Sequence, residues 1–142
     1  MEKDLVSVLM VNYNHADTIE KAVKSVLNQT YPKVQLIIVD DGSTDDSVEI
    51  VKNIKDSRIE LYEENVNRQI CAVTNIGMQK VRGEYFARID SDDLWEENKL
   101  EIQLKYLKEH PEHEICFTHA SIIDERDQII DSDLERLYAV TY

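Results

Sequence analysis

Three clusters of acidic and amide side chains follow short apolar segments of the chain. They are residues 12–14 (NYN), 40–43 (DDGS) and 90–93 (DSDD). If the apolar segments are parallel strands, their carboxyl ends meet at one edge of a sheet, which is where open α/β proteins bind ligands. The carboxylates gathered there repel one another, so the cluster needs a cation or hydrogen-bond donors.

The side chains of this edge predict a divalent metal site. Its carboxylates are Asp40, Asp41, Asp90, Asp92 and Asp93. Oxygen ligands suit Mg²⁺ or Mn²⁺, and a metal held by one or two carboxylates commonly completes its shell with water and substrate phosphates. Taken alone, each cluster also fits a capped helix start whose acids complement the helix dipole. Their joint position after separate strands favours metal-assisted handling of a phosphorylated ligand.

The elements that must position these clusters alternate along the chain. Nearly continuous apolar runs at 6–11 and 36–39 predict buried parallel strands, and 58–62, 84–89 and 115–123 predict three more. Apolar residues at helical spacing predict helices at 19–27, 48–54, 70–81 and 100–107. The expected fold class is α/β, a Rossmann-like, doubly wound, mostly parallel sheet with helices on both faces.

Two smaller features lead to structural expectations. Asp17 followed by Glu20 resembles a capping box at the start of the first helix. Cys71 and Cys116 form no CxxC or zinc-binding pattern, so we expect both to be reduced and packed in the core. Reduced cysteines fit a cytoplasmic protein.

Composition narrows the classes of partner. The chain has 142 residues, of which 42% are hydrophobic and 32% charged, as in one ordinary globular domain. Its net charge of −13 argues against a nucleic-acid partner, and against docking on an anionic membrane through a basic patch. No apolar stretch is long enough for a membrane span, so we expect at most peripheral association with the inner membrane face.

Four segments taken in order are similar to the family 2 glycosyltransferases of the GT-A fold. They are VSVLMVNYN, SVLNQTYP, LIIVDDGSTDDS and GEYFARIDSDDLW, and the resemblance runs from residue 5 to about residue 125. It implies a nucleotide-sugar donor, with a UDP-sugar favoured, and a divalent Mn²⁺ or Mg²⁺. It also implies inversion at the anomeric carbon and a glycan or lipid-linked acceptor.

The resemblance implies a nucleotide-binding role for several residues. Val11 and Tyr13 would line the base and ribose pocket, with main-chain groups of Val11 bonding the base and the Tyr13 ring stacking on it. Asp41 would accept the N3–H of a uracil-type base, while Asp40 supports the loop.

It implies a metal-binding role for the later acidic cluster. Asp92 would bind the metal directly, and Asp90 would reach the ribose or a metal-bound water. Asp93 would be either a second metal contact or an anchor for the following loop. Strand alternation places Arg88 where it either faces these acids or forms an ordinary surface ion pair.

The chain departs from the family pattern after the third predicted strand. Gln69 stands where the family often has glycine, and Thr74 where it often has an arginine near the diphosphate or sugar. Either Arg68 supplies the missing positive charge to the nucleotide, or that contact is lost.

Length affects the expected domain organisation. Residues 1–125 are predicted to form a nucleotide-diphospho-sugar-binding domain that is incomplete at its C-terminal side, and 126–142 a tail or the start of an acceptor-binding region. The catalytic base is expected near or beyond the C-terminus, where Asp131, Asp133 and Glu135 are available. The alternative function is a catalytically incomplete nucleotide-binding or protein-interaction module of the α/β class.

Overall fold

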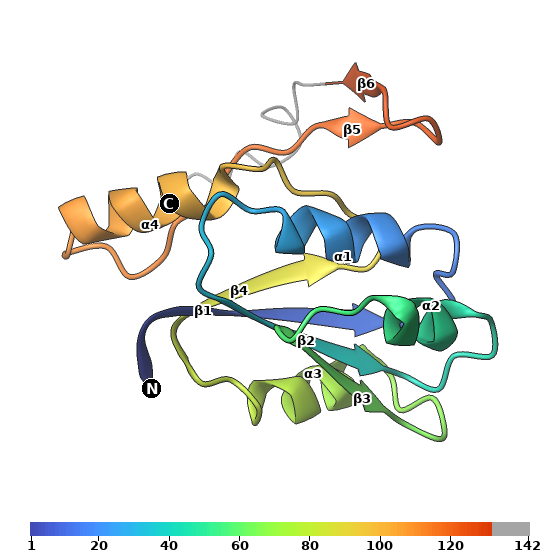
Figure 1. Cartoon of the computed structure of the whole chain (residues 1–142). Helices are drawn as coiled ribbons and strands as arrows, with labels where there is room; N and C mark the ends of the chain where they lie inside the picture. The colour runs from blue at the N-terminus through green and yellow to red at the C-terminus, as the bar shows by residue number, and fades with distance from the viewer. Residues whose placement is uncertain (132–142) are drawn as a thin grey trace. The chain divides into compact units, whose positions relative to one another are not determined.

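The computed structural model describes residues 1–131 and divides the chain into two compact units, Met1–Ile102 and Gln103–Tyr142 (Figure 1). The first unit contains a parallel sheet of four strands, in the order β3-β2-β1-β4. The strands are β1 (Glu2–Asn12), β2 (Val34–Asp40), β3 (Ile59–Glu63) and β4 (Gly83–Asp90).

The helices of the first unit cover both faces of this sheet. α1 (Ile19–Leu27) and α2 (Ser47–Asn53) lie on one face and α3 (Ile70–Met78) lies on the other, as Figure 1 shows. The strand order explains this, because right-handed crossovers from β1 to β2 to β3 run in one direction and the return to β4 runs in the other. This arrangement confirms the predicted doubly wound α/β class. α4 (Lys99–Glu109) begins in the first unit and continues into the second.

The register of the strands brings the polar clusters together. Asn12 of β1 is paired with Asp40 of β2, and Val11 of β1 is paired with Asp90 of β4. All three strands therefore end at the same level, and the loops that follow them share one edge of the sheet. The sequence clusters thus become neighbours in space.

The core is built on the two central strands. In β2, residues 36–39 are fully buried, and in β1, residues 8–10 are fully buried. α3 comes close to these strands at Gly77, where an added Cβ would stand 2.3 Å from Leu9 Cδ1. A side chain at this position would therefore push the helix away from β1.

The predicted fifth strand at 115–123 is wrong for most of its length. Only β5 (Ile122–Ile123) is a strand, and it pairs antiparallel with β6 (Ile129–Asp131) in the second unit. Ile115 and Phe117 are 68% and 88% exposed, so their apolar side chains do not enter the parallel sheet. Apolar composition alone does not show whether a segment finds a partner strand.

Two local expectations also differ from the structure. Thr18 occupies the N-cap of α1 without a side-chain cap hydrogen bond, and Glu20 pairs with Lys24 one turn later, so the capping box is not formed. Both cysteines are free, as expected, but Cys71 is exposed and Cys116 half-buried rather than in the core. No helix within residues 1–131 is both long and apolar enough to cross a bilayer.

Candidate functional site

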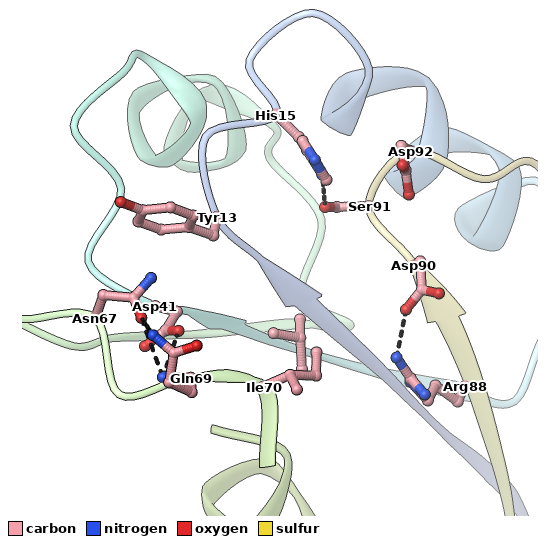
Figure 2. Close-up of a pocket in the computed structure, with 11 residues that line it drawn as sticks. Tyr13, His15, Asp41, Asn67, Gln69, Ile70, Arg88, Asp90, Ser91 and Asp92 are labelled. Atoms are coloured by element: carbon pink, nitrogen blue, oxygen red, sulfur yellow. Dashed lines mark hydrogen bonds and ion pairs between the residues drawn. The ribbon is translucent and has the colours of Figure 1, made fainter. Parts of the chain in front are cut away.

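A pocket of about 350 Å³ opens at the edge where β1, β2 and β4 end. Figure 2 shows its wall, with Tyr13, Asp41, Asn67 and Gln69 at one end and Arg88, Asp90 and Asp92 at the other. The side chains that line it come from the ends of β1, β2 and β4 and from the segment before α3: Val11, Tyr13, His15, Asp41, Asn67, Gln69, Ile70, Arg88, Asp90, Ser91 and Asp92.

The structure brings most of the predicted site residues into this pocket. Val11, Tyr13, Asp41, Asp90 and Asp92 line it. Three other predicted residues do not. They are the buried Asp40, Asp93 in the turn after β4, and Arg68, whose guanidinium Nε lies 2.5 Å from Glu64 Oε2.

The sequence prediction missed five residues of the wall, although three of them carried a signal. Gln69 had been noted as a departure from a glycine, and His15 directly follows the first polar cluster. Ser91 lies within the third polar cluster, at 90–93. Asn67 and Ile70 gave no signal of their own, because nothing in the sequence shows how the segment before α3 folds back over the sheet edge.

Asp40 is used inside the loop that follows β2. Its carboxylate accepts hydrogen bonds from Asn12 Nδ2 at 2.7 Å, from the Ser43 backbone N–H at 2.8 Å and from Ser43 Oγ at 2.6 Å. Since the residue is only 2% exposed, these bonds satisfy a charge that would otherwise be costly to bury. They fix the turn that carries Asp41.

The loop after β1 is tied to the loops on both of its sides. Asn14 Oδ1 accepts a hydrogen bond from the Thr44 backbone N–H at 2.7 Å, which joins it to the β2 loop. His15 Nδ1 lies 2.6 Å from Ser91 Oγ, which joins it to the β4 loop. These contacts hold Tyr13 in the pocket wall (Figure 2).

Asp41 anchors the segment before α3. It is 3% exposed, and its two carboxylate oxygens accept the backbone N–H groups of Arg68 at 2.6 Å and Gln69 at 3.0 Å. The same carboxylate therefore lines the pocket and shapes the wall facing it. A carboxylate oxygen has more than one acceptor site, so each oxygen keeps capacity for a ligand N–H.

Gln69 has an unusual backbone for a residue with a side chain. Its φ is 73° and its ψ is 154°, a region populated almost only by glycine, so the conformation costs about 1–3 kcal/mol. The hydrogen bond to Asp41 and the N–H bond to Asn67 Oδ1 at 3.1 Å hold it there. The side-chain Nε2 also donates to Asn67 Oδ1, at 2.8 Å.

The other end of the pocket is acidic. Arg88 Nη2 donates to Asp90 Oδ1 at 2.7 Å, and both side chains are about half exposed, at 47% and 50%. Desolvation first, and then the carboxylates of Asp92 and Asp90, raise the pKa of Asp93, while Arg88 acts in the opposite direction. Three carboxyl groups therefore interact unfavourably here. Carboxylate oxygens are the ligands that hard divalent cations prefer. Within the described part of the chain, however, the group of three potential metal-ligating side chains whose ligand atoms lie within 4.8 Å of one another is His110, Glu112 and His113, outside the pocket wall.

Comparison with known proteins identifies the family of this chain. The family model described as glycosyl transferase family 2 matches residues 7–140. The chain belongs to glycosyl transferase family 2. A relative in Escherichia coli, the UDP-Glc:alpha-D-GlcNAc-diphosphoundecaprenol beta-1,3-glucosyltransferase WfaP, is 35% identical over 127 residues, which is 89% of this chain and 49% of the relative. The chain thus spans about half the length of this family member.

Two solved structures share the GT-A fold of this family 2 chain. The S. aureus TarS 1-349 structure in complex with UDP has a TM-score of 0.71 and 25% identity, and covers 75% of this chain and 33% of that one. The mannosyltransferase PcManGT from Pyrobaculum calidifontis, in complex with GDP-Man and Mn2+, has a TM-score of 0.67 and 26% identity, and covers 86% of this chain and 36% of that one.

Proposed function

We propose that this chain is the donor-binding part of an inverting, metal-dependent glycosyltransferase. The donor is a nucleotide-diphosphate sugar, with a UDP-sugar favoured, and the acceptor is a glycan or lipid-linked glycan. The observation that carries the proposal is the pocket itself, which joins an aromatic end at Tyr13 and Asp41 to an acidic end at Asp90 and Asp92. The family membership and the UDP named for WfaP and TarS support the choice of donor.

The aromatic end suits the base and ribose. The Tyr13 side chain is 43% exposed at the rim of the pocket, where its ring can stack on a base. Asp41 offers carboxylate oxygens to the N3–H of a uracil-type base, and the main chain of Val11 lies in the same wall. Asp40 and Arg68 act indirectly in this proposal, the first by fixing the loop of Asp41 and the second through its backbone N–H.

The acidic end suits a metal and the diphosphate. Asp92 would hold Mn²⁺ or Mg²⁺ directly, with Asp90 reaching the ribose or a metal-bound water, and Asp93 a second contact or a loop anchor. When bound, such an ion acts as a Lewis acid that stabilises negative charge on the departing diphosphate. Arg88 offsets the charge of Asp90 through their half-exposed ion pair.

The catalytic base is not assigned. An inverting transfer needs a group that takes the proton of the acceptor hydroxyl as it attacks. The side chain of Asp131, and Asp133 and Glu135 entirely, lie outside the described residues. The second candidate is a catalytically incomplete nucleotide-binding or protein-interaction module of the α/β class. It shares the donor site and differs in showing no transfer to any acceptor.

Titration calorimetry with UDP tests the donor site. We expect UDP to bind in the presence of Mn²⁺ and to bind at least about tenfold more weakly in EDTA, a difference of about 1.4 kcal/mol. Asp92→Asn should remove the dependence on Mn²⁺, and the matched control Asp17→Asn, at an exposed position outside the pocket wall, should retain it. Equal UDP affinity with and without metal in folded wild-type protein would contradict the proposal.

A further inference from the structure

Gln69 combines a strained backbone with a position in the pocket wall. Of the residues lining the pocket, all within the described chain, it alone has a positive φ. Glycine would adopt this conformation without steric cost. Strained residues concentrate at functional sites and persist only where the surrounding structure holds them, as Asp41 and Asn67 hold the Gln69 backbone N–H here. The strained backbone of this pocket residue therefore indicates that Gln69 has a functional role.

The exposed side chain of Gln69 lies at the aromatic end of the pocket. Its Nε2 donates to Asn67 Oδ1 at 2.8 Å, and the Gln69 backbone N–H is held by Asp41. Figure 2 shows Gln69 beside Asn67 and Asp41, at the end away from Asp92. The carboxamide therefore occupies space at the base-binding end that a glycine would leave open.

Fold alone does not decide which base this kind of pocket accepts. The S. aureus structure contains UDP and the Pyrobaculum structure contains GDP-Man, and both share this fold, with TM-scores of 0.71 and 0.67. A pyrimidine and the larger purine are thus both compatible with this arrangement of strands and helices. Discrimination between them must come from side chains at the base end.

We propose that Gln69 is a specificity-determining residue that favours pyrimidine over purine nucleoside diphosphates. The inference rests on the proposed function, because it needs the pocket to bind a nucleotide. The second ring of a purine needs room beyond that of a pyrimidine, and the carboxamide hydrogen-bonded to Asn67 limits that room. A steric difference of one methylene in a pocket changes discrimination by about 10- to 200-fold, so removing a carboxamide should be readily measurable.

The test measures UDP and GDP binding to the full chain in the presence of Mn²⁺. We expect the wild type to prefer UDP, and both Gln69→Gly and Gln69→Ala to reduce the ratio of UDP to GDP affinity by about tenfold or more. Gln69→Gly relieves the backbone strain and Gln69→Ala does not, so only the former should raise the unfolding midpoint. Asp127→Gly changes another residue with positive φ, outside the pocket wall, and should leave the ratio unchanged.

The outcomes separate this inference from the proposed function. If Gln69 had only a structural role, Gln69→Gly would shift the unfolding midpoint and leave the ratio of UDP to GDP affinity unaltered. That result would overturn this inference and leave the proposed function intact. A wild type that prefers GDP would also overturn it. A folded wild type that binds neither nucleotide with Mn²⁺ would refute the proposed function, and the inference with it.

Discussion

Asp41→Asn tests whether the buried carboxylate holds the pocket wall together. The side chain is 3% exposed, and its two oxygens accept the N–H groups of Arg68 at 2.6 Å and Gln69 at 3.0 Å. Asparagine keeps one acceptor oxygen and turns an NH₂ toward the other N–H, so donor faces donor. We expect Asp41→Asn to destabilise the segment before α3 and the pocket wall that this segment forms.

The size of the effect follows from these two bonds. A hydrogen bond to a charged group contributes about 1.5–3 kcal/mol, and the variant loses one such bond. The loss is limited at Gln69, whose N–H has a second acceptor in Asn67 Oδ1 at 3.1 Å. We therefore expect the free energy of unfolding to fall by about 1.5–3 kcal/mol, equivalent to a fall in Tm of roughly 4–10 °C.

Urea unfolding at pH 7 measures this change, with an unaltered m-value showing that the transition remains comparable. The matched control is Glu63→Gln, which removes a carboxylate charge from an exposed pair with Lys52 at 2.8 Å. Exposed pairs of this kind contribute about 0–1 kcal/mol, so the control should stay near the wild type. If Asp41→Asn were as stable as Glu63→Gln, the proposed anchoring role of Asp41 would be refuted.

Three further changes test the fold. Gly77→Ala places a methyl 2.3 Å from Leu9 Cδ1 and should cost about 1–3 kcal/mol in urea unfolding, although alanine favours helix; a more stable variant would contradict the packing of α3. Leu36→Ala, in the fully buried centre of β2, should cost about 2–5 kcal/mol by the same measurement, and a loss under about 1 kcal/mol would contradict its burial. Burial alone raises the pKa of Glu60, but hydrogen bonds led by that from Arg82 lower it below the ordinary range. The contribution of the Glu60 carboxylate to stability is therefore fully present above its ordinary pKa of 4.5 and is lost as the pH falls below that value. Glu60→Gln should therefore weaken the pH dependence of unfolding between about pH 5 and pH 3.

The two central strands were predictable because they are buried on both faces, whereas β3 and β4 are only partly buried. Residues 6–11 and 36–39 contact the core on both faces of the sheet, so they form nearly continuous apolar runs in the sequence. A polar cluster follows each of these strands. The strand register then puts Asp40 beside Asn12 and Asp90 beside Val11. The position of the site followed from that periodicity and from the rule for ligands at strand ends.

Other features depended on contacts between distant segments, which periodicity does not encode. The segment before α3 forms part of the pocket wall because the Asp41 carboxylate accepts hydrogen bonds from two of its backbone N–H groups. Because these donors belong to the backbone, no pattern of side chains in the sequence predicts the contact. The sequence leaves open whether Arg68 supplies a positive charge to the nucleotide or this contact is lost, and in the structure its guanidinium lies close to the Glu64 carboxylate, four residues before it. The segment at 115–123 has the composition of a strand, yet only its last two residues pair with another strand.

A crystal structure of the chain with UDP and Mn²⁺ tests the central claim most directly. The account predicts the uracil ring against Tyr13 with its N3–H toward Asp41, and the metal bound by Asp92 and the diphosphate at the other end of the pocket. UDP bound outside this pocket, or a diphosphate held there with no metal contact to Asp92 or Asp90, would contradict it.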